Sequence, residues 1–196
     1  MWSAQSMTAT PMVEAREKLN ILSFLEDVRG TLEPDRQMLL EMLSGVLAHE
    51  RGVGGLYWQY TQHTGNQELK EKWQRFGKET ESHRMIAERV IGALGGDPSY
   101  KGSIARDHEK LAACFTNIEA QGCAGDHMRL GNLVMAENIS KLLWRGMHRL
   151  GVSIKDSSTA KVLWDAARIV VPSKEEHLNY NTTMYEGCLD MLSTRS

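Results

Sequence analysis

The sequence has few prolines, few cysteines and no excess of charge of either sign, and each shortage narrows the possible classes of protein. Four prolines in 196 residues leave long stretches free to form helices. The three cysteines contain no C-x-x-C pair, which excludes a disulfide framework or a zinc ribbon and favours a reducing compartment. A formal net charge of −2 provides no basic surface for nucleic acid.

Long apolar runs are also missing. No run approaches the roughly eighteen residues that a membrane-spanning helix needs. The first dozen residues lack the basic region and the apolar core of a secretory signal. We therefore expect a cytoplasmic protein that binds neither membranes nor nucleic acid.

What the sequence does contain is helical periodicity. Apolar residues three and four apart predict helices over about 11–30, 35–64, 67–94, 127–150 and 157–192, the last interrupted at Pro172. Gly65-Asn66 is typical of a tight turn, and residues 97–126 form a long connection with a short amphipathic stretch. Two helical hairpins joined by a long crossover predict an all-α, antiparallel four-helix bundle over residues 35–196. Residues 1–34 would form an N-terminal extension with one additional helix.

Each of the four long helices carries an acidic residue or a histidine where its core-facing stripe calls for an apolar one. These residues are Glu50 in the first helix, Glu79 and His83 in the second, Glu137 in the third, and Glu176 and His177 in the fourth. Burying an unpaired carboxylate costs roughly several kcal/mol, so such residues need partners. Their distances along the chain from the two predicted turns place all of them at a similar depth. The pattern predicts one cluster whose oxygen and nitrogen donors suit iron or manganese.

Several short segments of the sequence resemble the ferritin-like superfamily, which includes bacterioferritins, rubrerythrins and manganese catalases. They are His49-Glu50-Arg51, Glu79-Thr-Glu-Ser-His83, Gly95-Gly-Asp-Pro-Ser-Tyr100 and Glu176-His177-Leu178. The resemblance covers roughly residues 35–192. It implies a four-helix bundle with one or two iron or manganese ions held by the six residues of the predicted cluster.

The sequence departs from the ligand spacing of that superfamily. Ferritin-like di-iron sites place a glutamate three residues before each histidine, whereas Thr80 and Lys174 occupy these positions here. Glu79 lies one turn before His83 and can substitute. Glu176 is adjacent to His177, so both point inward only if the helix is distorted near Pro172. A metal pair, a single metal and an emptied site all remain open. His49 precedes Glu50 and is expected to point away from the cluster, either at the surface or next to one of the ligands.

Three functions follow from these alternatives. The first is a di-iron or di-manganese protein that reacts with oxygen or peroxide. The second is a metal-free ferritin-like scaffold that serves as a binding or assembly module. The third is the subunit of an iron-storage cage. We expect self-association, with a dimer favoured, and the apolar stripe of the predicted helix over 11–30 suggests the interface.

Overall fold

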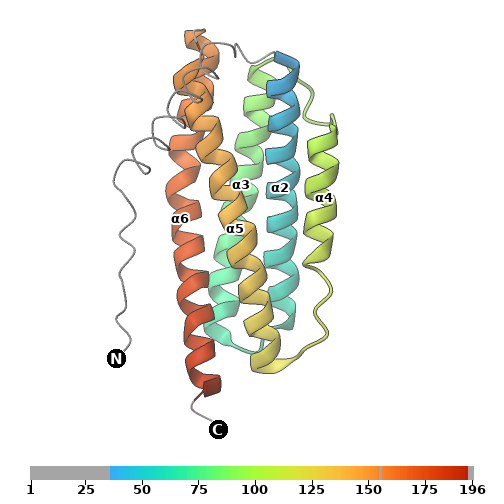
Figure 1. The fold of residues 1–196 in the computed structure, drawn as a ribbon, viewed down its shortest axis with the longest axis vertical. Helices are drawn as coiled ribbons and strands as arrows, with labels where there is room; N and C mark the ends of the chain where they lie inside the picture. The colour runs from blue at the N-terminus through green and yellow to red at the C-terminus, as the bar shows by residue number, and fades with distance from the viewer. Residues whose placement is uncertain (1–35, 155, 194–196) are drawn as a thin grey trace, which may run out of the picture. The chain divides into compact units, whose positions relative to one another are not determined.

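The computed structural model describes residues 36–154 and 156–193, and these residues form five helices (Figure 1). They are α2 (Arg36–His63), α3 (Gln67–Ala93), α4 (Ser103–Cys114), α5 (Gly122–Ser153) and α6 (Ser157–Ser193). The predicted bundle and its crossover are confirmed. The predicted helix over 11–30 and the proposed boundary near residue 35 lie outside the described residues.

Two antiparallel hairpins, α2 with α3 and α5 with α6, make up the bundle (Figure 1). Asn66 begins α3, because its side chain accepts hydrogen bonds from the backbone N–H groups of Glu68 and Leu69. Gly95 ends the same helix with a φ of 69°, a left-handed conformation that favours glycine. Asp156 caps the start of α6 in the way that Asn66 caps α3. Each helix pair is thus defined by a polar cap at its turn.

The predicted interruption of the last helix is wrong. The α6 helix runs through Pro172 without a break, and the proline ring lies on its exposed side. Because the helix stays regular, residues three and four apart keep a common face. This regularity decides which residues of α6 face the interior.

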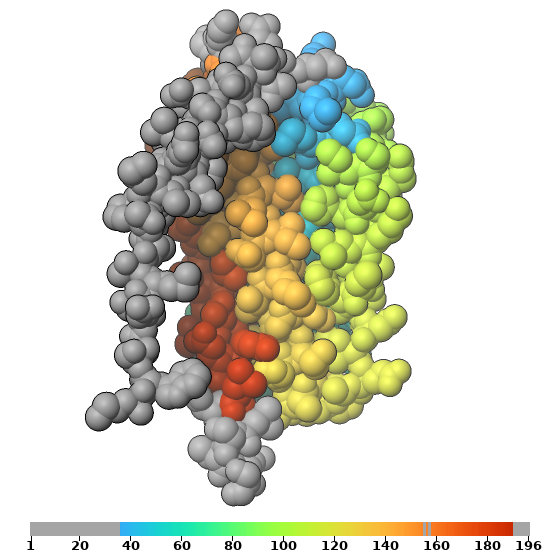
Figure 2. All heavy atoms as spheres, in the orientation of Figure 1, coloured from blue at the N-terminus to red at the C-terminus, as the bar shows by residue number. Residues whose placement is uncertain are grey.

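The short helix α4 lies along the outer side of α2, and the space-filling view shows it covering that flank (Figure 2). Glycines on α2 allow the close approach. A Cβ atom at Gly52 would lie 2.6 Å from the Cβ of Ala112, and Gly45 faces Ile104 in the same way. The crossover therefore forms a fifth packed element, and it buries a side of α2 that would otherwise face solvent.

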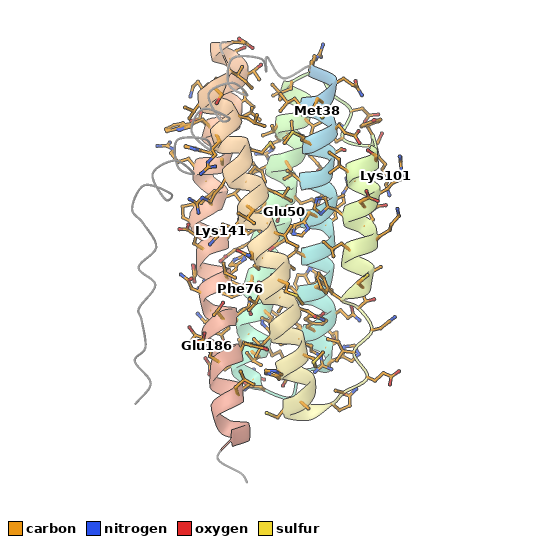
Figure 3. All side chains as sticks on the ribbon, viewed as in Figure 1. Met38, Glu50, Phe76, Lys101, Lys141 and Glu186 are labelled. Atoms are coloured by element: carbon orange, nitrogen blue, oxygen red, sulfur yellow. The ribbon has the colours of Figure 1, made fainter. Side chains whose placement is uncertain are left out.

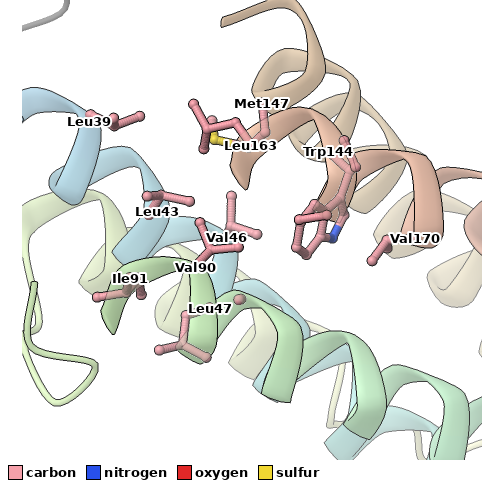
Figure 4. Close-up of a cluster of buried hydrophobic side chains, with 13 residues drawn as sticks. Leu39, Leu43, Val46, Leu47, Val90, Ile91, Trp144, Met147, Leu163 and Val170 are labelled. Atoms are coloured by element: carbon pink, nitrogen blue, oxygen red, sulfur yellow. The ribbon is translucent and has the colours of Figure 1, made fainter. Parts of the chain in front are cut away.

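Buried apolar side chains form two clusters, one toward each end of the bundle. The first, drawn in Figure 4, includes Leu43, Val46, Ile91, Trp144 and Val170. The second includes Tyr57, Trp73, Phe76, Leu133 and Cys188. Between them lies a layer of polar side chains, and Figure 3 shows one of these, Glu50, about midway along the bundle. None of the helices described here has the length and apolar character needed to cross a membrane.

Candidate functional site

The polar layer brings together side chains from all four long helices. Glu50 on α2, Glu137 on α5, and Lys174 and His177 on α6 are each at most 1% exposed. From α3 come His83, which is buried, and Glu79, which is partly exposed. Because charged groups are almost never fully buried without partners, the contacts within this layer determine what it can do.

Lys174 lies at the centre of the layer. Its Nζ is 2.8 Å from Glu50 Oε2 and 3.2 Å from Glu137 Oε2, so one ammonium joins two carboxylates from different helices. The contacts are close ion pairs, although their angles are poor for hydrogen bonds. The lysine thereby links α6 to both α2 and α5.

The imidazole of His177 bridges Glu137 to a third carboxylate, that of Glu79. Its Nδ1 is 3.0 Å from Glu137 Oε1, and its Nε2 is 2.7 Å from Glu79 Oε2. The ring also packs against Phe76, with 4.1 Å between the ring centroids. His177 therefore extends the network from α6 to α3.

Neutral hydrogen-bond donors occupy the remaining oxygens of the two buried carboxylates. Ser140 and Trp144 both donate to Glu50 Oε1, the indole N–H at 2.9 Å. Tyr57 donates its hydroxyl to Glu137 Oε1 at 2.8 Å, and it accepts a hydrogen bond from Asn181 at 3.0 Å. These contacts hold both carboxylates in one orientation, with Oε2 directed at the lysine.

The electrostatics of the layer favour charged carboxylates and a charged lysine. Burial raises the pKa of Glu137, but the Lys174 ammonium and the hydrogen bonds from His177 and Tyr57 outweigh burial and bring the pKa to about 2. The same balance of burial against the ammonium lowers the pKa of Glu50. Burial depresses the pKa of Lys174, yet Glu137 and Glu50 overcome it and raise the net value. Glu50, Glu137 and Lys174 thus hold one another in their charged forms.

His83 behaves differently from the other members of the layer. Burial and the nearby Lys174 ammonium lower its pKa to about 4, which keeps the imidazole neutral at physiological pH. Its Nδ1 is 3.9 Å from Glu50 Oε2, beyond hydrogen-bond distance, and that nitrogen has no hydrogen-bond partner. His83 is therefore a neighbour of the charged network without being joined to it.

Five of the six residues predicted as metal ligands meet in this layer, and Glu176 does not. Glu176 is an exposed residue of α6 that pairs with Arg75 on α3. Of the two positions expected for His49, the surface one is wrong: it is buried, and its Nε2 is 2.9 Å from the carbonyl oxygen of Ala136. The residue that sequence analysis missed is Lys174. Its position one turn before His177 and after Val170, on the inner stripe of α6, was the available signal.

The layer does not fit a metal pair. The oxygens that would bind metal ions, Glu50 Oε2 and Glu137 Oε2, both face the Lys174 ammonium. Among the described residues no group of three or more histidine, cysteine, aspartate or glutamate side chains is arranged to hold a metal ion. Thr80, at the other glutamate position of the ferritin-like pattern, contributes a buried hydroxyl without a partner.

Comparison with known proteins supports the fold. No protein-family model and no curated protein matches the chain. A solved structure is similar: "A Dodecameric Thioferritin in the Bacterial Domain, Characterization of the Bacterioferritin-Related Protein from Bacteroides fragilis". The identity is 17%, with a TM-score of 0.63, and the alignment covers 92% of this chain and 98% of that one. The chain thus has a ferritin-like fold.

Proposed function

We propose that this chain is a ferritin-like scaffold in which a lysine has taken the place of the metal ions, and that it works as an assembly module without bundle-centre redox chemistry. The observation that carries the proposal is the Lys174 ammonium between Glu50 and Glu137. All three side chains are at most 1% exposed.

The charge of the lysine accounts for the loss of metal binding. A divalent cation beside the two Oε2 atoms would meet the ammonium at close range, and like charges repel strongly where water is excluded. Displacing the ammonium would leave a buried lysine without partners, which costs several kcal/mol, roughly. The sequence-based prediction of iron or manganese ligands is therefore the competing hypothesis that metal analysis tests.

A charged layer of this kind suits a scaffold because it specifies how the helices align. Lys174 contacts α2 and α5 at one depth, and His177 contacts α3 and α5 at the adjacent depth. Sliding any helix by one turn would separate a buried charge from its partner. Buried polar groups are known to select a single register in helical assemblies.

Self-association is the assembly role that we propose. The outward side of α5 carries an apolar stripe at a seven-residue spacing, formed by Met128, Met135 and Leu142. Each of these side chains is about half exposed, and such a spacing is typical of helices that pack against another helix. The Bacteroides protein is described as dodecameric, whereas the sequence alone favoured a dimer; light scattering distinguishes the two assemblies.

The metal content of the purified protein tests the proposal directly. We expect protein from iron- and manganese-supplemented medium to hold less than about a tenth of an equivalent of either metal per chain, because the ammonium occupies the site. Elemental analysis by mass spectrometry, with and without reconstitution, measures this content. One equivalent or more of tightly held iron or manganese would overturn the proposal in favour of the metal centre.

A charge-reversing variant tests whether Lys174 is what prevents metal binding. Lys174→Glu restores a glutamate three residues before His177, the spacing of ferritin-like ligands. We expect it to bind about one equivalent of a divalent metal under conditions in which the wild type binds none. Lys161→Glu changes the same residue type on the exposed side of α6 and is the matched control, which should remain metal-free.

A further inference from the structure

Two of the three cysteines lie at the same end of the bundle, on neighbouring helices. Cys123 is in the first turn of α5 and is exposed, whereas Cys188 is near the end of α6 and only 6% exposed. Both helix ends reach the same end of the bundle in Figure 1. Cys188 belongs to the apolar cluster that includes Tyr57 and Trp73.

The register of α5 and α6 places the two thiols opposite each other. Glu137 contacts Lys174; Cys123 lies fourteen positions before the glutamate, and Cys188 lies fourteen positions after the lysine. Fourteen residues are close to four helical turns, so both cysteines stay on the faces that the ion pair uses. The stacking of His127 on Tyr185, at 4.3 Å between ring centroids, shows the same antiparallel alignment near this end.

The thiols are neighbours as well as being in register. The Cys123 side chain acts on the Cys188 thiol and raises its pKa. A disulfide needs Cβ atoms about 3.5–4.5 Å apart on facing side chains. Two neighbouring thiols in register on antiparallel helices can meet this requirement by rotation of their side chains.

We propose that Cys123 and Cys188 form a reversible disulfide on oxidation, which covalently ties the start of α5 to the end of α6. The oxidant is a low-molecular-weight disulfide. The exposed Cys123 thiolate attacks one of its sulfurs, so that a Cys123–S–S–R bond forms and one RS⁻ leaves. Cys188 then loses its proton to solvent and attacks Cys123 Sγ, releasing the second RS⁻. One protein dithiol and one small disulfide thus become one protein disulfide and two small thiols.

The order of the two steps follows from accessibility and charge. Burial, the Cys123 thiol and the Asp126 carboxylate raise the pKa of Cys188, so this thiol does not begin the exchange. Cys114 lies on a different helix, is exposed, and donates its thiol hydrogen to the carbonyl of Lys110. It is therefore a surface thiol that provides an internal control.

Peptide mapping tests the proposal in the full-length Cys114→Ser variant. The variant is used because Cys114 and Cys123 share one tryptic peptide, 111–129, and Cys188 lies in 175–195. After treatment with oxidised glutathione and blocking of free thiols, we expect these two peptides to appear linked within one chain. Loss of two titratable thiols should accompany the link, and the Tm should rise by about 5–15 °C because the unfolded chain is constrained.

Two single variants complete the experiment. Cys123→Ser and Cys188→Ala should each abolish both the linked peptides and the rise in Tm, and reduction should reverse them in the parent. Glutathione bound at Cys123 while Cys188 remains free to react with iodoacetamide would overturn the proposal. A link found only between two chains would overturn it equally.

Discussion

Lys174 places a full positive charge between Glu50 and Glu137 at a depth that water does not reach. At such a depth, the effect of the lysine on folding stability depends on whether its partner charges are present. An isolated buried carboxylate lowers the free energy of unfolding, whereas a paired one can leave it unchanged. The contribution of the lysine is therefore best measured by removing it with and without its partners.

We expect Lys174→Met to lower the free energy of unfolding by about 3–5 kcal/mol, because it leaves two buried carboxylates without a counter-charge. Adding Glu50→Gln and Glu137→Gln to the same chain should recover most of that loss, since the buried charges are then gone. Urea unfolding followed by circular dichroism measures both. Lys161→Met, which removes an exposed i,i+4 ion pair with Asp165, is the control and should cost less than about 1 kcal/mol.

The neutral state of His83 predicts a loss of stability on mild acidification. Its folded-state pKa is about 4, below the ordinary value of 6.5, because burial, the Lys174 ammonium and His177 lower the pKa by more than Glu50 and Glu137 raise it. Between these two pH values His83 binds a proton in the unfolded chain but stays neutral in the folded chain. The stability that this group provides is complete above pH 6.5 and is lost as the pH falls toward 4, by on the order of 2–3 kcal/mol.

His83→Gln should flatten the dependence of unfolding free energy on pH between 6.5 and 4. His49, whose pKa burial also lowers, keeps some slope in the variant. His63→Gln, which changes an exposed histidine at the end of α2, is the control for a substitution outside the polar layer. Equal slopes in the wild type and in His83→Gln would show that His83 is charged in the folded protein.

At the scale of helices, periodicity predicted the elements and most of the inward positions. Glu50, Glu137 and His177 were identified because each interrupts an apolar stripe on its own helix. The α6 helix shows where such reasoning stops. Expecting an acidic ligand beside His177 directed attention to Glu176, although an unbroken helix turns that residue outward and Lys174 inward.

A lysine is normally expected at the surface because its burial needs counter-charges. Here the counter-charges come from α2 and α5, so α6 alone gives no sign of them. The burial of His49 has a similar cause. That residue points away from Glu50, but α4 packs on that side of α2, and the His108 ring lies 5.0 Å from the His49 ring. Contacts between helices decided both cases.

At the scale of the whole molecule, the outer stripe of α5 predicts how copies of the chain associate. A carboxylate in the middle of an apolar contact loses its water without gaining a partner. We therefore expect Met135→Glu to reduce the native mass to that of a monomer, measured by light scattering, while circular dichroism stays unchanged. Met38→Glu, at a similarly exposed position near the start of α2, is the control and should keep the wild-type mass.

Removal of residues 1–30 tests whether this interface or the one suggested by the sequence holds the chains together. In the second, the predicted helix over 11–30 joins two chains. If α5 forms the contact, the truncated protein has the same number of chains per particle as the wild type, and Met135→Glu still dissociates it. A truncated protein that is monomeric, together with a Met135→Glu variant of wild-type mass, would assign the interface to the N-terminal segment. A wild type that is monomeric at micromolar concentration would contradict both interfaces, because an obligate assembly that buries an apolar stripe is held together at that concentration.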